Sequence, residues 1–190
     1  MCYIIACIPI AENRVYTAHT GLRRKEREAL ATMKDMHDVP ADAPLKLENQ
    51  LCFALYAASR ATIDIYRPLL DEMGITYSQY LVLLILWEKG TCSVKDIGSF
   101  LYLDSGTLSP LLKRLEAAGF IKRQRRVDDE RVVDISLSGE GHALKDRAAS
   151  IPEKFYCELD FSLEEYVDLL ARLKMLTERL HVRQKKRPES

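Results

Sequence analysis

The most reactive side chains in this sequence are its cysteines, and their spacing limits the chemistry available to them. No two form a CxxC pair, and no histidine lies nearby at metal-ligand spacing, so we expect no metal site and no cofactor. With 47% apolar residues and no secretory signal, the chain is not expected to rely on disulfides, and the predicted compartment is the reducing cytoplasm. The five cysteines are Cys2, Cys7, Cys52, Cys92 and Cys157.

Cys52 is the candidate for redox chemistry. A thiolate attacks the O–O bond of a peroxide, which requires an accessible sulfur and neighbours that stabilise its negative charge. Tyr56 follows four residues later, on the same face of a helix, and its phenol can donate a hydrogen bond to the sulfur. The apolar Phe53 and Leu55 suit an organic hydroperoxide better than hydrogen peroxide. A lone helical cysteine is more often a small buried hydrophobe, so these residues alone leave both interpretations open.

Positive charge is concentrated between residues 113 and 131, although the whole chain holds 28 Lys+Arg against 28 Asp+Glu. Just upstream, Ser105, Thr107 and Ser109 fall at the N-terminal end of a predicted helix, where hydroxyls and free N–H groups can contact phosphates and base edges. Arg131 falls at the tip of a predicted hairpin and suits a minor groove. A charge run alone often marks a solvated surface, but its combination with this helix and hairpin favours DNA binding. The cations assigned to DNA contact are Lys113, Arg114, Arg123, Arg125 and Arg131.

Apolar periodicity predicts the elements that position these residues. Repeats of roughly three to four residues indicate helices, and strict alternation indicates strands. Pro68 is expected to end the first helix, and Pro110 to kink the helix that contains it or to delay its start. The fold class is therefore mainly α with a small β-hairpin, a winged helix-turn-helix. The expected helices cover residues 45–66, 78–88, 93–101, 105–118 and 163–180, and the expected strands cover residues 121–126 and 132–137.

The last predicted helix carries a continuous apolar stripe from Leu163 to Leu180. A stripe of this kind on a small domain must be covered, and a second copy of the chain is the most economical cover. We therefore expect a homodimer, with dimerisation helices at the N- and C-terminal ends of the winged domain. His37, His142 and His181 have no partner at ligand spacing and are expected on the surface.

Composition divides the chain near Pro44. Residues 1–44 form an N-terminal extension, either a disordered arm or the product of a start codon assigned upstream of Met33 or Met36. Residues 45–182 form the winged domain with its dimerisation helices, and residues 183–190 form a basic polar tail. The apolar start is too short to span a bilayer, so no membrane partner is expected.

Three blocks of the sequence resemble a known family. Residues 103–115 (LDSGTLSPLLKRL), followed by Asp129-Glu130-Arg131, resemble the recognition helix and wing of the MarR family. Residues 45–56 and 75–80 resemble the organic hydroperoxide resistance branch of that family, which also carries a proline in the recognition helix. The likeness extends over about residues 45–180.

This resemblance implies a homodimeric repressor, not an enzyme, that binds a pseudo-palindromic double-stranded DNA operator when reduced and leaves it when an organic hydroperoxide oxidises Cys52 to a sulfenic acid. Tyr66 and Tyr77 match the family tyrosines that contact the reactive sulfur across the dimer, and Tyr56 matches a neighbour. Cys157 falls in the region where some members carry a second cysteine that resolves the sulfenic acid as an intersubunit disulfide.

Other functions remain compatible with the residues. The same fold could be a repressor released by a small aromatic ligand, for which Cys52 would be dispensable. A thiol peroxidase using Cys52 and Cys157 is less consistent, because no CxxC motif, thioredoxin-like pattern or general base is evident. A purely helical interaction module leaves the clustered arginines unexplained.

Overall fold

The computed structural model describes residues 45–185; the N-terminal extension and the last five residues of the predicted basic tail lie outside the described residues. Two compact units, residues 1–62 and 63–190, divide the chain inside helix α2 (Leu51–Asp71). Each unit is taken by itself below. None of the helices in residues 45–185 combines the length and the apolarity that a bilayer span requires.

Helix α2 differs from the prediction at both ends. A short 3-10 turn, η2 (Leu47–Asn49), precedes it, so the α-helix begins at Leu51 rather than at residue 45. The prediction that Pro68 ends the helix is wrong, because Pro68 lies inside it and the helix continues to Asp71. Proline removes only the hydrogen bond to the carbonyl of Asp64, and both residues are exposed, so that carbonyl can be hydrated.

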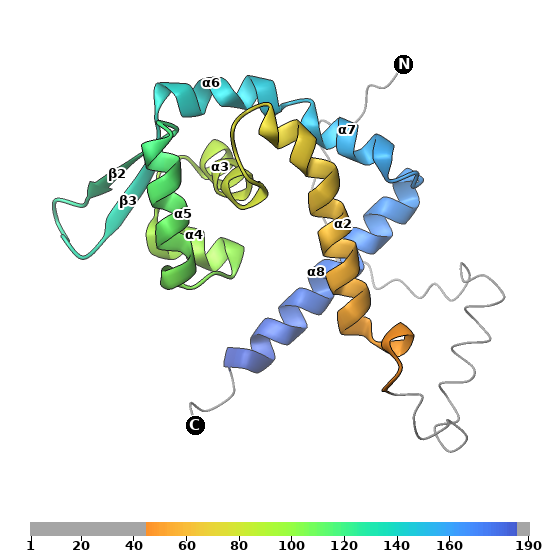
Figure 1. Ribbon diagram of the computed structural model, residues 1–190. Helices are drawn as coiled ribbons and strands as arrows, with labels where there is room; N and C mark the ends of the chain where they lie inside the picture. The colour runs from red at the N-terminus through yellow and green to blue at the C-terminus, as the bar shows by residue number, and fades with distance from the viewer. Residues whose placement is uncertain (1–44, 186–190) are drawn as a thin grey trace. The chain divides into compact units, whose positions relative to one another are not determined.

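The core of the second unit is built around α3 (Tyr77–Lys89), as its apolar sequence predicts. A capping box begins this helix: the Thr76 hydroxyl accepts a hydrogen bond from the Gln79 N–H, and the Gln79 side chain accepts one from the Thr76 N–H. Val82 and Leu83 are fully buried. The helix therefore forms the centre against which the next two helices and the hairpin pack, as Figure 1 shows.

Helices α4 (Val94–Leu101) and α5 (Ser105–Ala117) form the predicted helix-turn-helix. The Ser93 hydroxyl caps α4 by accepting from the Asp96 N–H, and Asp104 caps α5 in the same way through the Thr107 N–H. Helix α5 begins at Ser105, as expected, and includes Pro110, so of the two alternatives given for this proline the delayed start is wrong. The turn is tight because the backbone passes close to Gly98, where an added Cβ would lie 2.9 Å from the carbonyl oxygen of Leu103.

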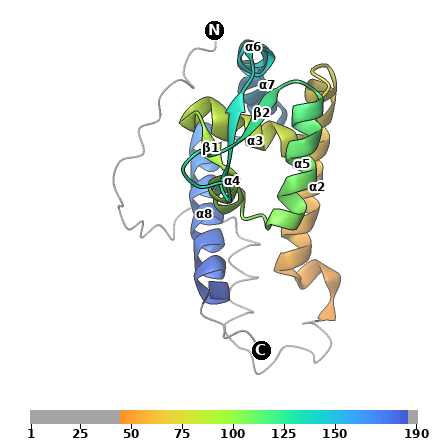
Figure 2. The ribbon, with the colours of Figure 1, turned by 90° about the vertical axis from the view of Figure 1, so that its left-hand side faces the viewer.

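The predicted hairpin consists of β2 (Ile121–Arg125) and β3 (Val133–Leu137), which pair antiparallel with Arg123 opposite Ile135. A third strand, β1 (Cys92–Ser93), was not predicted; it pairs with the other edge of β3 and gives the order β1-β3-β2. Two residues are too few to show a period of two in the sequence. Figure 2 shows β1 beside the hairpin.

Three helices complete the second unit: α6 (Gly139–Ala148), α7 (Ile151–Glu158) and α8 (Leu163–Lys185). Ser138 ties α6 to the end of α5, because its buried hydroxyl donates to the Gly119 carbonyl and accepts from the Gly141 N–H. The apolar stripe on α8 remains exposed; its exposed members include Leu163, Val167, Leu170, Leu173 and Leu180.

Candidate nucleic-acid interface and redox cysteines

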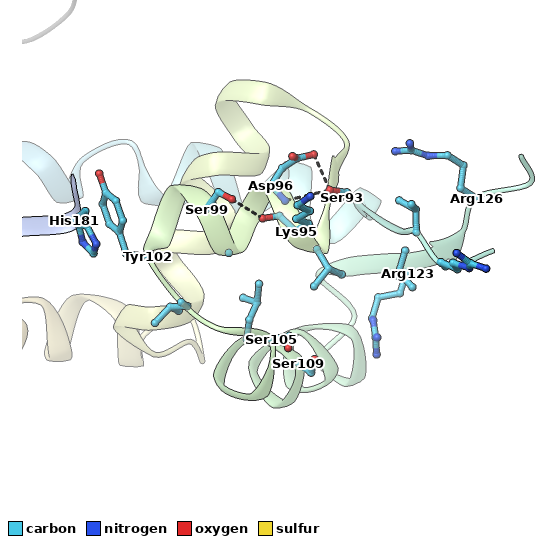
Figure 3. A pocket seen from close by; sticks show the side chains of 17 residues that line it. Ser93, Lys95, Asp96, Ser99, Tyr102, Ser105, Ser109, Arg123, Arg126 and His181 are labelled. Atoms are coloured by element: carbon cyan, nitrogen blue, oxygen red, sulfur yellow. Dashed lines mark hydrogen bonds between the residues drawn. The ribbon is translucent and has the colours of Figure 1, made fainter. Parts of the chain in front are cut away.

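A groove of about 1030 Å³ opens between α4, α5 and the hairpin. Its lining is rich in cations and hydroxyls, as the close view in Figure 3 shows for Lys95, Ser105 and Arg126. Four of the residues assigned to DNA contact from the sequence line this groove together: Ser105, Ser109, Arg123 and Arg131. The tertiary structure thus gathers onto one surface side chains that are spread along the sequence.

The N-terminal end of α5 has a well-defined hydrogen-bonding pattern. Asp104 accepts both the Thr107 N–H at 2.9 Å and the Thr107 hydroxyl at 3.0 Å. These hydrogen bonds, the backbone one first, hold the pKa of the Asp104 carboxyl below its usual range, so it stays ionised as a cap. The Thr107 hydroxyl therefore supports the cap, while the side chain of Ser105 is exposed at the start of the helix.

The predicted cations differ in how freely they can contact a ligand. Lys113, Arg114 and Arg125 are exposed. Arg123 is only 24% exposed, pairs with Glu116 of α5 at 3.7 Å, and points toward α5 in Figure 3. Its buried Nε has no hydrogen-bond partner within residues 45–185. Arg123 thus links the hairpin to the recognition helix as well as lining the groove.

The hairpin tip presents Arg131 through a local turn. The Arg131 N–H donates to the carboxylate of Asp129 at 3.0 Å, and the Val132 N–H donates to the Asp129 carbonyl at 2.9 Å. Aspartate favours such turns because its side chain can accept a nearby backbone N–H. The Asp-x-Arg spacing therefore has a physical meaning: the aspartate shapes the turn, and the exposed arginine lies at its tip.

Two features of the groove were missed from the sequence. Asp134 of β3 accepts two hydrogen bonds from Arg126, at 2.9 Å from Nε and 2.6 Å from Nη2, and this pairing lowers the pKa of Asp134 and raises that of Arg126. Lys95 and Ser99 reach the groove from α4. Cross-strand pairing could have suggested the Arg126–Asp134 contact, whereas only the tertiary structure brings Lys95 to the groove.

The sulfur of Cys52 belongs to the first unit and is exposed on α2. Tyr56 is 57% exposed, and its hydroxyl accepts a hydrogen bond from the Arg60 guanidinium at 3.0 Å. Cys52, Tyr56 and Arg60 follow one another at intervals of four, so they lie along one face of the helix. Arg60 was not singled out from the sequence, although this spacing could have revealed it.

Tyr66 and Tyr77 are brought together in the second unit. Their ring centroids are 5.1 Å apart, and Tyr66 also stacks on Phe155 of α7 at 4.6 Å. Burial raises the pKa of Tyr66 well above its usual range, with the neighbouring Tyr77 adding to the effect, and burial also raises the pKa of Tyr77. Both phenols are therefore neutral hydrogen-bond donors at physiological pH.

The other thiols and histidines of the second unit lie in distinct surroundings. Cys157 is exposed on α7, whereas Cys92 is buried in β1, as expected for a structural residue. His181, expected on the surface, lines the groove, and its ring stacks on Tyr102 at 3.9 Å between centroids. No group of residues within 45–185 has the composition of a metal site.

Comparison with known proteins agrees with this geometry. The pattern of the MarR family matches residues 75–133, which contain the helix-turn-helix and most of the wing. The organic hydroperoxide resistance transcriptional regulator of Bacillus subtilis (strain 168) is 52% identical over 137 residues, covering 72% of this chain and 93% of the relative. The transcriptional regulator TtmR of Methylorubrum extorquens (strain PA1) is 45% identical over 163 residues, covering 86% of this chain and 84% of the relative.

A solved structure of reduced AbfR bound to DNA aligns with a TM-score of 0.63 and 39% identity, over 72% of this chain and 94% of that one. The AbfR of Staphylococcus epidermidis aligns with a TM-score of 0.59 and 36% identity, over 73% of this chain and 95% of that one. The fold and the groove thus define a winged-helix, DNA-binding transcriptional regulator rather than an enzyme. The chain belongs to the MarR family.

Proposed function

We propose that this regulator is a homodimeric repressor that releases its operator when an organic hydroperoxide oxidises Cys52. The observation that carries the proposal is the exposed Cys52 sulfur on α2, on one helix face with Tyr56 and Arg60. An exposed thiol meets the access that peroxide attack requires, and a phenol and a guanidinium on the same face can stabilise negative charge. The relative named for organic hydroperoxide resistance supports the signal. Solved structures of AbfR include a reduced form and an overoxidized form, both bound to DNA.

In the proposed oxidation, the Cys52 thiolate attacks the terminal oxygen of the hydroperoxide. The S–O bond forms as the O–O bond breaks, the sulfur becomes a sulfenic acid, and the alkoxide that leaves takes up a proton to become an alcohol. The Cys157 thiolate then attacks the sulfenic sulfur, forming a disulfide and expelling hydroxide, which is protonated to water. A solved structure of disulfide-formed AbfR, with 36% identity and a TM-score of 0.52, supports this second step by analogy. In that scheme Tyr66 and Tyr77 donate hydrogen bonds to the Cys52 sulfur from the partner subunit.

On the DNA side, the proposal places the N-terminal end of α5 at base edges and phosphates through Ser105, Thr107 and Ser109. Exposed cations on α5 and the hairpin, among them Lys113, Arg114 and Arg125, would neutralise phosphates, with Arg123 in a supporting position and Arg131 directed to a minor groove. The exposed apolar stripe of α8 supports dimerisation, because a large exposed apolar surface on a small domain is commonly an interface. A two-fold symmetric dimer implies a pseudo-palindromic operator.

The test measures binding of the reduced protein to a duplex that the wild type selects from a random pool, by fluorescence anisotropy before and after cumene hydroperoxide. Wild type should bind and then release, whereas Cys52→Ser should bind and remain bound. Cys92→Ala is the matched control, since this cysteine is buried in β1 and should leave the response unchanged. Release of Cys52→Ser as readily as wild type would overturn the sensing mechanism and leave only a DNA-binding regulator.

A further inference from the structure

Tyr102 ends α4 in an unusual backbone conformation. Its φ of 55° and ψ of 36° are left-handed, and its N–H donates to the Gly98 carbonyl. Positions of this kind favour glycine, because a Cβ in the left-handed region clashes with the backbone. A tyrosine at this site is therefore costly in backbone terms, which indicates that its side chain makes a compensating contact.

That contact is with helix α8. The rings of Tyr102 and His181 are stacked almost parallel, with centroids 3.9 Å apart and 6° between their planes. Figure 3 shows the two rings face to face at one end of the groove. Between them lie 78 residues of sequence, so the stack is a long-range contact between the helix-turn-helix and the last helix.

Tyr102 lies between two hollows of the surface and contributes to the lining of both. On one side Tyr102 lines the groove together with Ser105 and Ser109 of the recognition helix. On the other side it lines a smaller hollow together with Leu173 and Thr177 of α8. Asp104, the cap from which α5 begins, follows Tyr102 by two residues, so the stack joins α8 to the turn before the recognition helix.

We propose that the Tyr102–His181 stack is a positioning contact that holds the recognition helix at a set place on α8, and so sets the specificity of DNA binding. This inference rests on the proposed function, because α8 carries the apolar stripe through which we expect the dimer to form. In a dimer the two α8 helices would set the spacing between the two recognition helices. Without the stack, that spacing would no longer match the spacing of the two DNA half-sites. Sequence-independent binding to phosphates does not require a fixed spacing.

The experiment measures, for the reduced protein, the affinity for the duplex selected by wild type and for a scrambled duplex. We expect His181→Ala to lower affinity for the selected duplex about five-fold or more, the lower end of typical coupling between sites, with little change for the scrambled duplex. His181→Phe retains a flat ring and should restore discrimination. His142→Ala, which changes an exposed histidine of α6, is the matched control and should behave as wild type.

Tyr102→Gly separates positioning from stability. It removes the ring but places glycine at a left-handed position, so thermal stability should not fall, whereas discrimination between the two duplexes should. Unchanged discrimination in His181→Ala and Tyr102→Gly would overturn the inference, as would a His181→Phe variant as defective as His181→Ala. If the wild type itself bound the selected and the scrambled duplex equally well, the proposed function would be overturned instead.

Discussion

The salt dependence of operator binding provides a quantitative test of the groove as a DNA interface. Arg131 is exposed at the hairpin tip, held there by the Asp129 turn, and lines the groove. Each cation that neutralises a phosphate contributes about 0.9 to the slope of log affinity against log salt. A homodimer presents Arg131 twice, so Arg131→Ala should reduce the magnitude of this slope by about 1.8.

That change in slope has a measurable consequence. Between about 50 and 200 mM salt, the advantage of wild type over Arg131→Ala should shrink about twelve-fold. Anisotropy titrations at four or more salt concentrations give both slopes directly. Arg172→Ala is the matched control: this exposed arginine of α8 pairs with Asp168 at 2.8 Å and does not line the groove, so its slope should equal that of wild type.

Two results would refute the reasoning. If the slope of log affinity against log salt were the same for Arg131→Ala and wild type, the Arg131 side chain would not neutralise a DNA phosphate. Equal flattening in the Arg131 and Arg172 variants would show that the effect reflects the net charge of the protein rather than a located interface.

Two further predictions concern the scaffold. Gly141→Ala should destabilise the fold by about 1–3 kcal/mol, because the added methyl would collide with the Phe120 carbonyl, whereas Gly139→Ala, with open space around it, should be nearly neutral in urea unfolding. Equal effects of the two would contradict the packing described. Burial raises the pKa of Tyr66 above its ordinary 10.0, so above about pH 10 the unfolded chain loses this proton before the folded protein does. The free energy of unfolding should therefore be unaffected by Tyr66 below about pH 10 and should fall as the pH rises beyond it. Tyr66→Phe should flatten this alkaline loss in thermal melts, and an unchanged pH profile would count against it.

Much of the fold could be predicted because its signals are local. Ser93 precedes a helix, followed after a tight turn by the helix that contains Leu108 and Leu112, and both leucines are buried as their spacing predicts. The hairpin alternation likewise predicted β2 and β3. Pro68 misled the prediction because a proline is tolerated inside a helix where its partner carbonyl faces solvent, and solvent exposure is a tertiary property.

The candidate site divides in the same way. The spacing of Cys52 and Tyr56, together with the family resemblance, marked Cys52 as a possible reactive thiol. Turn signals in the sequence marked Arg131 as a hairpin cation. Burial and long-range proximity are set by how the elements pack, so the ring cluster of Tyr66, the ion pair of Arg126 and the stack on His181 were not evident in the linear chain. The sequence by itself therefore determined the helix-turn-helix, the hairpin and their chemical groups. The tertiary structure decided which groups meet, because those contacts join segments far apart along the chain.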